Sequence, residues 1–263
     1  MNVLIVHAHP EPKSFNGALT RAAVRALREQ GHSAEVSDLY AMKWKPAADA
    51  DDYAGSREDL DYLRIDREQK FAHDAGTTAC DIITEQAKVR RADLVLFQYP
   101  MWWFGPPAIL KGWFDRVFTR GFAYLPGRKY DTGLMAGKLA MVSVTTGTSA
   151  DTYAPDGIDG AILDILWPVH NGILRYTGFD VLAPFITHMP GKISHDGRRA
   201  VLARYAGEIQ DLASRHRLFF HPRDDYGPDE RLLSGVRPQS GFQHRDCGRG
   251  QNRLLGHSGR LNG

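Results

Sequence analysis

The sequence predicts an α/β fold, a doubly wound parallel sheet of five strands with helices on both faces. Short apolar runs alternate with helical segments five times along the chain, which is typical of a parallel sheet. The runs are continuously apolar, as expected for strands that are buried on both faces. Three of them end in loops rich in polar or aromatic side chains. Sheets of this kind bind ligands beyond the carboxyl ends of their strands.

The first half of the chain contains three of the expected strands. The expected order is strand 3–6, helix 15–29, strand 34–36, helix 80–90 and strand 93–98. Gly31 follows the first helix, at a position where glycine commonly ends a helix. Residues 43–75 are charged and irregular. We therefore expect a long excursion there, with one short helix.

The second half supplies the remaining two strands. The expected order is helix 107–118, loop 121–137, strand 138–145, helix 158–176, strand 179–186 and helix 197–215. Pro107 suits the first turn of a helix, whereas Pro168 should interrupt or kink the helix that contains it. No repeat or linker breaks the pattern, so residues 1–225 are predicted to form one domain.

Composition narrows the class of protein. The 263 residues are 43% hydrophobic and 24% charged, with a formal net charge of +2. These values argue against wholesale disorder, collagen and coiled coil. A net charge this close to zero gives the protein no general electrostatic attraction to nucleic acid or to an anionic membrane. No apolar run reaches the roughly 18 residues of a transmembrane helix, so no membrane insertion is expected.

The expected location is the cytoplasm. The chain has two cysteines, Cys80 and Cys247, which are too few for a disulfide scaffold and point to a reducing compartment. The first residues lack the basic region and cleavage site of a signal peptide and are predicted to be a strand.

Residues 226–263 differ from the rest of the chain. From 231 onward the segment contains six arginines and a single acidic residue, with many glycines. It is predicted to be a poorly ordered tail. The alternative is an arm that packs on a partner subunit or binds an anion.

The first loop suits an anion. Ser14, Asn16 and Gly17 surround a helix start, where backbone N–H groups and the helix dipole favour negative charge. His9 and Lys13 can add charge-assisted contacts. The glycine-rich fingerprints of dinucleotide and Walker loops are absent, and ordinary capping of the helix by Ser14 explains the pattern equally well. His7 and His9 have a spacing that occurs in metal sites, but no nearby Cys or acidic residue completes a ligand set, so no metal is expected.

The other two loops suit a planar ring. Aromatic residues are concentrated in a short stretch that also contains three prolines and Gly105: Phe97, Tyr99, Trp102, Trp103 and Phe104. Such a wall fits a heterocycle, although part of the cluster must be core because alternate residues point in opposite directions. The third loop, 145–149, offers hydroxyls and amides for the polar edge of a flavin, or is a plain turn. Together the three loops suggest a flavin site and redox chemistry supplied by the cofactor.

Several motifs carry a specific resemblance. They include, in order, Ser14-Phe15-Asn16, Ser37-Asp38-Leu39-Tyr40-Ala41-Met42, Trp103-Phe104-Gly105, Pro107-Ala108-Ile109-Leu110-Lys111-Gly112-Trp113-Phe114, Thr145-Thr146-Gly147 and Ile165-Leu166-Trp167-Pro168. With them the chain resembles the NAD(P)H:quinone oxidoreductase (DT-diaphorase) family over about residues 3–220. The resemblance implies a flavodoxin-like homodimer that binds FAD non-covalently at the dimer interface.

The resemblance also implies roles for individual residues. On the adenosine and pyrophosphate side of FAD the matching residues are His9, Phe15, Asn16 and Ala18, and Arg198 and Leu202 match further FAD contacts. Ser14, at the helix start described above, is also expected to be a cofactor-binding residue. Around the isoalloxazine they are Pro100, Met101, Trp102, Trp103, Phe104, Thr145, Thr146 and Gly147. Tyr153 matches the tyrosine at the pyrimidine edge of the flavin. The substrate pocket is implied to involve Trp103, Phe104 and Thr148, with Tyr124 covering it from the other subunit.

Four positions depart from the family pattern. Animal members carry a histidine where this chain has Asp159, and Asp159 is therefore the expected catalytic partner of Tyr153. Thr148 stands where a second glycine is usual. Trp102 replaces a smaller polar residue, and Pro126 replaces a second tyrosine of the pocket. Cofactor binding is expected to carry over better than substrate choice.

The leading hypothesis is therefore a FAD-dependent NAD(P)H:quinone oxidoreductase. Hydride passes from NAD(P)H through the flavin to a quinone in a ping-pong, two-electron reaction. One alternative is a regulatory flavin-binding subunit of a potassium efflux system, because the family includes such ancillary proteins. Another is a nitro- or azo-compound reductase. FMN is the alternative cofactor, and the choice between NADH and NADPH is open.

Overall fold

The computed structural model describes residues 1–238. The chain divides into two compact units, Met1–Leu218 and a second unit that begins at Phe219, and each is described by itself. Most of the expected arginine- and glycine-rich tail, residues 239–263, lies outside the described residues. In the described part of the second unit, η5 (Arg223–Asp225) follows His221, whose Nδ1 lies 2.7 Å from Asp225 Oδ2.

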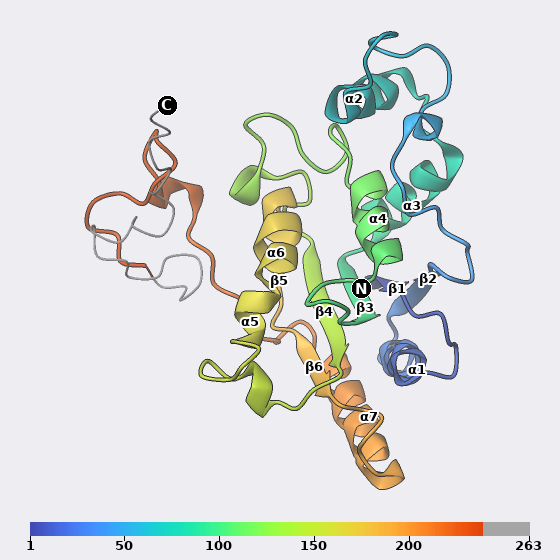
Figure 1. Cartoon of the computed structure of the whole chain (residues 1–263), viewed down its shortest axis with the longest axis vertical. Helices are drawn as coiled ribbons and strands as arrows, with labels where there is room; N and C mark the ends of the chain where they lie inside the picture. Colours follow the sequence, from blue (N-terminus) through green and yellow to red (C-terminus); the bar gives the residue numbers. More distant parts are fainter. Residues whose placement is uncertain (239–263) are drawn as a thin grey trace, which may run out of the picture. The chain divides into compact units, whose positions relative to one another are not determined.

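One parallel sheet forms the centre of the first unit (Figure 1). Its strands are β1 (Asn2–His7), β2 (Ser33–Asp38), β3 (Leu94–Pro100), β4 (Leu139–Thr146), β5 (Asp180–Val181) and β6 (Phe185–His188). The order is β2-β1-β3-β4-β5, and β6 also pairs with β4. All registered pairs are parallel, so the predicted sheet type is confirmed.

The prediction of five strands was wrong in its count, because the expected strand 179–186 is broken in two. β5 pairs with the beginning of β4, and β6 pairs with its end. Pro184 lies in the break and has no N–H to donate to a sheet. The Arg215 guanidinium donates to Ala183 O at 2.7 Å and to Pro184 O at 3.0 Å. The break therefore has its carbonyl groups satisfied by a side chain.

Helices cover both faces of the sheet. They are α1 (Phe15–Glu29), α2 (Ile65–Ala75), α3 (Cys80–Arg91), α4 (Ala108–Val117), α5 (Ile162–Ile165), α6 (Trp167–Val169), η4 (His170–Arg175) and α7 (His195–Gln210). Short turns of helix are η1 (Ala50–Asp52), η2 (Tyr130–Thr132) and η3 (Asp151–Tyr153). Within residues 1–238, no helix combines the length and the apolarity needed to cross a bilayer.

Alternate side chains of the central strands enter two separate cores. On one face Val3 and Ile5 pack with Tyr205 and other buried residues of α1 and α7. On the opposite face Phe97 contacts Trp113 and Phe114 of α4, with ring centroids 5.8 and 5.0 Å apart. This alternation explains the continuous apolar runs of the central strands β1, β3 and β4, whereas the edge strand β2 is mostly exposed.

The predicted interruption near Pro168 is confirmed, because the expected helix 158–176 is divided into α5, α6 and η4, a π-helical segment. Two other helix predictions need correction. The last helix ends at Gln210 rather than near 215, because Arg215 turns back to the carbonyls of the broken strand. The excursion 43–75 contains two helical segments, η1 and α2, instead of one.

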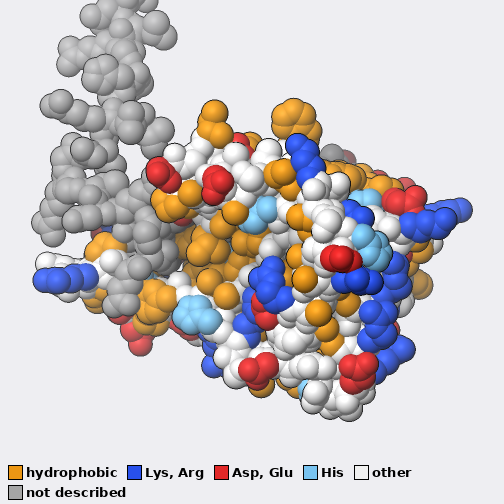
Figure 2. Space-filling view, turned by 90° about the horizontal axis from the view of Figure 1, so that it is seen from below, with side chains coloured by type: hydrophobic (Ala, Val, Ile, Leu, Met, Phe, Trp, Pro, Cys, Tyr) orange, Lys and Arg blue, Asp and Glu red, His pale blue; other side chains and the backbone are white. Residues whose placement is uncertain are grey.

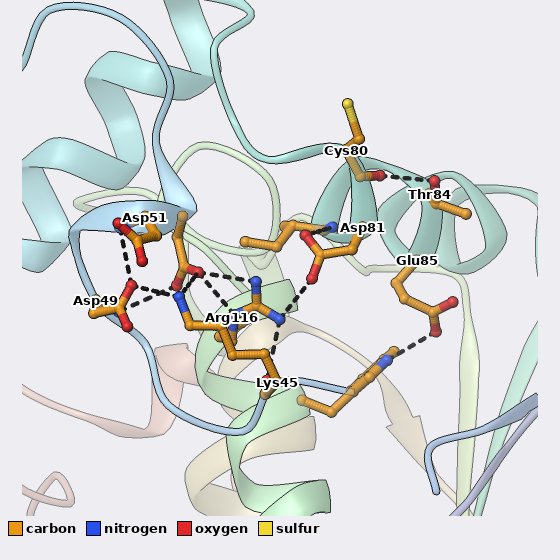
Figure 3. A network of polar contacts seen from close by, with 11 residues as sticks. Lys45, Asp49, Asp51, Cys80, Asp81, Thr84, Glu85 and Arg116 are labelled. Atoms are coloured by element: carbon orange, nitrogen blue, oxygen red, sulfur yellow. Dashed lines mark hydrogen bonds and ion pairs between the residues drawn. The ribbon is translucent and has the colours of Figure 1, made fainter. Parts of the chain in front are cut away.

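A buried arginine holds the excursion against α4 (Figure 3). Arg116 is 2% exposed and donates through Nε and Nη2 to Asp52 Oδ1, at 3.0 and 2.9 Å. Its Nη1 donates to Lys45 O at 3.1 Å and pairs with Asp81 at 2.8 Å. The guanidinium also lies 4.5 Å from the centre of the Trp44 ring. One side chain of α4 therefore binds η1, the chain before it and the start of α3.

Close backbone packing completes this contact. A Cβ atom on Gly112 would lie 1.9 Å from Pro46 O. Only glycine permits the excursion to lie this close to α4. This close contact explains why the motif 107–114 contains a glycine at position 112.

His170, at the start of η4, makes stability depend on pH. Burial lowers the pKa of His170 to about 4, and its Nε2 has no hydrogen-bond partner among residues 1–238. The unfolded chain binds a proton near pH 6.5 and the folded chain does not. Stability is therefore lost as pH falls from 6.5 toward 4. We expect this group to contribute a loss of about 3 kcal/mol over that range.

Urea unfolding at pH 7 and pH 4.5 measures this contribution. His170→Phe should retain more of its pH 7 stability at pH 4.5 than the wild-type protein does. His195→Phe, at an exposed histidine of α7, is the matched control and should keep the wild-type loss. Equal losses in all three proteins would assign the acid sensitivity to other groups.

Candidate functional site

The three chemistry-bearing loops lie side by side, as predicted. They follow β1, β3 and β4, which are neighbours in the sheet. Ala8 N donates to Gln98 O at 3.0 Å, and Met101 N donates to Thr145 O at 2.8 Å. These hydrogen bonds extend the sheet pairing into the loops and fix the three loops relative to one another.

A buried polar network lies beneath the loops. Asn16 Nδ2 donates to Thr145 Oγ1 at 2.9 Å, and Gln98 Nε2 donates to Asn16 Oδ1 at 2.8 Å. The Tyr205 hydroxyl donates to Gln98 Oε1 at 3.3 Å. The Asn16 side chain, which the resemblance assigned to FAD, therefore faces protein groups and positions the first loop against the end of β4.

Two helix starts lie at this edge of the sheet. Ser14 caps α1 by accepting from Gly17 N at 3.1 Å, which is the ordinary capping interaction that the sequence also allowed. Ser194 caps α7 in the same way, accepting from Gly197 N at 3.1 Å. The two helices pack against each other. Their first turns leave backbone N–H groups available for an anion.

Side chains support both helix starts. Pro12 O would lie 2.4 Å from a Cβ on Gly17, so glycine is needed for the loop to fold onto α1. Arg198 donates to Ile193 O at 2.9 Å and keeps the loop before α7 in place. The remaining assigned residues of this side, Phe15, Ala18 and Leu202, are half-buried. Phe15 and Leu202 pack on the core shared by α1 and α7.

The aromatic loop is divided between core and surface. Phe97 and Tyr99 are fully buried, and Pro100 and Met101 are also buried. Trp102, Trp103 and Phe104 are 43, 100 and 51% exposed. The uncovered part is therefore the tripeptide at the tip of the loop.

The exposed tip is a tight turn with an unusual backbone. Trp102 N donates to Gly105 O and Gly105 N donates to Trp102 O, both at 3.0 Å. Trp103 and Phe104 between them have φ angles of 50° and 57°. Two positive φ angles define a type I′ turn, which glycine and asparagine favour and large aromatic residues do not. Such strain is typical of functional loops that are held in place by their surroundings.

His9 links the first loop to the aromatic tip. Its ring centroid lies 6.4 Å from that of Trp102. Its Nδ1 accepts from Glu11 N at 3.0 Å. Burial lowers the pKa of His9, although Glu11 opposes the shift. His9 is therefore mainly neutral near pH 7, with Nε2 as its second polar atom.

The third loop presents an open turn. Thr145 and Thr146 are buried at the end of β4, whereas Gly147 and Thr148 are exposed. A Cβ atom on Gly147 would meet no atom within 4 Å, so the space above it is open. Thr148 Oγ1 donates to Asp159 Oδ2 at 3.1 Å, and Thr152 Oγ1 donates to Thr148 Oγ1 at 2.9 Å. Two positions that depart from the family pattern, Thr148 and Asp159, are therefore bonded to each other.

Tyr153 has a neighbour that sequence reasoning missed. The His188 ring, at the end of β6, lies against Tyr153 with centroids 5.6 Å apart and planes tilted by 32°. Its Nδ1 lies 2.9 Å from Thr146 Oγ1. His188 pairs in register with Thr146, at the same edge of the sheet. The available signal was a histidine just beyond a predicted strand, but the expected strand ended at residue 186.

Tyr124 lies with a different set of residues. It follows α4, and its ring packs edge-on against Tyr176 at 5.6 Å. An open groove of about 720 Å³ adjoins both rings, with Ile65, Lys111, Phe114 and Ile173 among its lining residues. The structure of the single chain does not bring Tyr124 to the three loops.

The three loops form a surface that fits a flavin. Exposed indole and phenyl groups provide a flat apolar wall, the open Gly147 turn provides room, and Thr146, Tyr153 and His188 provide a polar edge. The two capped helix starts suit phosphate groups. Within residues 1–238 no cluster of three or more His, Cys, Asp or Glu side chains suits a metal ion.

Known proteins share this architecture. A family model described as a flavodoxin-like fold matches residues 1–211. The chain belongs to this flavodoxin-like family. It is 46% identical over 211 residues to human ribosyldihydronicotinamide dehydrogenase [quinone], with 80% of this chain and 91% of that protein covered. It is 43% identical over 219 residues to guinea pig (Cavia porcellus) NAD(P)H dehydrogenase [quinone] 1, with 83% and 80% covered.

A solved structure gives the same result. The flavodoxin-like chain superposes on a candidate quinone reductase from Klebsiella pneumoniae with a TM-score of 0.87 and 40% identity. The match covers 91% of this chain and 96% of that one. The resemblance to the quinone oxidoreductase family, first inferred from short motifs, is therefore confirmed.

Proposed function

We propose that this chain is an FAD-dependent NAD(P)H:quinone oxidoreductase. The observation that carries the proposal is the strained Trp102–Gly105 turn, which holds aromatic side chains in solvent beside the Gly147 turn. Membership of the family implies a flavin and NAD(P)H. The relatives named as quinone dehydrogenases support a quinone as acceptor.

Each group of residues has a role in this proposal. When bound, FAD supplies two-electron hydride chemistry. Trp103 and Phe104 stack on one side of the substrate slot and exclude water. Thr146 and Gly147 orient the polar edge of the ring system, and Tyr153 stabilises negative charge there. The Asn16–Gln98–Thr145 network keeps these groups in place, since each of its members is buried.

FAD is favoured over FMN because two helix starts lie at the site. FMN has one phosphate, whereas FAD has two and an adenosine. The capped starts of α1 and α7 offer donors for this larger group, beside His9 and Arg198. Arg198 is half-buried and already bonded to the loop before α7, so it would hold the adenosine side mainly through position and charge.

We also propose that the enzyme acts as a homodimer. Tyr124 and Tyr176 line the open groove beside α4, away from the three loops. Phe114, Phe118 and Ile173 also line this groove, and further hydrophobic side chains (orange) are exposed on the face of the molecule drawn in Figure 2. A second copy on the groove would cover apolar surface and bring its Tyr124 near a flavin site, as the resemblance implies. Residues 1–225 would form the catalytic domain, acting in the cytoplasm.

Cofactor release and steady-state kinetics test the proposal. The pure protein is expected to release FAD on heating, identified by chromatography. Initial rates with NAD(P)H and a quinone should give the parallel lines of ping-pong kinetics, because one slot serves both substrates. Released FMN would overturn the FAD assignment, and a demonstrated ternary complex would overturn the shared slot. A protein that takes up neither flavin would leave a non-enzymatic binding role.

A further inference from the structure

We infer that His188 is the positioning residue for Tyr153 and the proton carrier of the site, a role that the family resemblance would place at position 159. This inference rests on the proposed function, and it concerns the polar edge of the same site. It assigns the proton step of quinone reduction to a residue outside the motifs that carry the resemblance.

The contacts of Asp159 remove it from this role. Its carboxylate accepts from the Thr148 hydroxyl at 3.1 Å, and its backbone N donates to Thr152 O at 2.9 Å. Thr148 in turn accepts from Thr152. An ionised carboxylate held in this way adds negative charge next to a flavin that gains negative charge on reduction. Position 159 therefore cannot stabilise that charge as a histidine would.

His188 occupies the place that is needed. It lies against Tyr153 of η3 and hydrogen-bonds with Thr146, whereas the Asp159 carboxylate accepts from the Thr148 hydroxyl. It comes from the last strand of the sheet, and its backbone is fixed by pairing with Thr146. The imidazole is therefore held on a rigid element, as a residue that orients a neighbour must be.

The hydrogen bonds also determine the tautomer of His188. The Thr146 hydroxyl donates its single hydrogen to Thr148 O at 2.9 Å. The same oxygen lies 2.9 Å from His188 Nδ1, so it must accept from an Nδ1–H group. Neutral His188 consequently has its lone pair on Nε2. Nε2 is the atom that gains and releases a proton.

The chemistry requires such a group. A quinone becomes a hydroquinone by gaining one hydride and one proton. Bound FAD would supply the hydride chemistry, with NAD(P)H as the donor that would leave as NAD(P)⁺. The proton is taken from solvent by His188 Nε2 when negative charge accumulates at the polar edge. It leaves Nε2 when the hydroquinone forms, so the imidazole returns to its neutral state.

The free protein is poised for this uptake. Burial lowers the pKa of His188, with the Thr148 backbone opposing the shift. The imidazole is therefore mainly neutral near pH 7 before the reaction. Negative charge nearby raises the pKa of a histidine, so reduction and protonation are expected to occur together.

Two variants of His188 separate the proton from its structural contacts. His188→Asn keeps a donor toward Thr146 and loses the titratable nitrogen. His188→Phe keeps a ring against Tyr153 and loses the hydrogen bond. The measurements are made on the holoenzyme: the midpoint potential of the bound flavin, and proton uptake on reduction, followed with a pH indicator. His216→Asn, at an exposed histidine, is the control.

The inference expects both variants to have a lower potential and less proton uptake. A tenfold loss of preference for the reduced state corresponds to a shift of about 30 mV. A decrease in His188→Asn alone would show a packing role, and a decrease in His188→Phe alone would show a hydrogen-bonding role. Either result overturns the inference, as does an equal decrease in Asp159→Asn.

The inference and the proposed function fail in different ways. A wild-type protein that holds FAD and reduces quinones, with both His188 variants unchanged in potential and proton uptake, leaves the proposed function in place and overturns the inference. A wild-type protein that holds no flavin overturns both. A lower potential in both His188 variants, with the control unchanged, supports the assignment.

Discussion

Replacing Arg116 by methionine is expected to lower the free energy of unfolding by about 3–5 kcal/mol. Arg116 and Asp52 are each 2% exposed and are joined by two hydrogen bonds. Methionine fills much of the same volume but leaves the Asp52 carboxylate buried without its main partner. It also removes the stacking on Trp44 and the link to Asp81.

Urea unfolding followed by circular dichroism measures the effect. Lys111→Met is the matched control on the same helix, because Lys111 and Asp115 form an exposed i,i+4 pair at 2.6 Å. Its expected cost is about 0.3–0.5 kcal/mol. A loss below about 1 kcal/mol for Arg116→Met would show that solvent reaches Asp52 and that the excursion is not held by this arginine.

A double variant tests the mechanism of the loss. Asp52→Asn in the Arg116→Met background removes the buried charge that the first substitution leaves behind. It should recover part of the lost stability, because an unpaired charge costs more to bury than an amide. Lys45 also contacts Asp52, at 3.1 Å, so the recovery is expected to be partial.

Most of the sheet could be predicted from the sequence because its central strands β1, β3 and β4 are buried on both faces. Such strands give continuous apolar runs, and the loops that follow the runs 3–6, 93–98 and 138–145 must reach the same edge in a doubly wound fold. The division of the expected fifth strand, 179–186, into β5 and β6 could not be predicted in this way. The break at Pro184 depends on Arg215, which is distant in sequence.

The sequence predicted which loops form the site, but it did not predict how their residues are arranged. The sequence identified the aromatic and threonine loops, yet the turn places Trp103 and Phe104, rather than Gly105, at positive φ. Local preferences favour the opposite arrangement. The approach of His188 to Tyr153 depends on the register between β4 and β6. That register is a non-local property which apolar periodicity does not determine.

Replacing Trp103 by glycine is expected to change stability and flavin affinity in opposite directions. The φ angle of 50° is strained for tryptophan, and the side chain is fully exposed and loses little packing when it is removed. Glycine should therefore raise the free energy of unfolding of the flavin-free protein by about 1 kcal/mol. The dissociation constant for FAD should increase by about tenfold or more, because a stacking face is lost.

Lys43→Gly separates the two effects. Lys43 is also exposed and has a φ of 53°, but it lies in the excursion and not in the three loops. It should show the gain in stability with an unchanged affinity for FAD, measured by quenching of flavin fluorescence. If Trp103→Gly gained stability and kept its affinity, the strained turn would have no role in binding. The gain in stability and the loss of FAD affinity expected for Trp103→Gly have one cause. The backbone strain at Trp103 persists because the exposed ring contributes to binding rather than to folding.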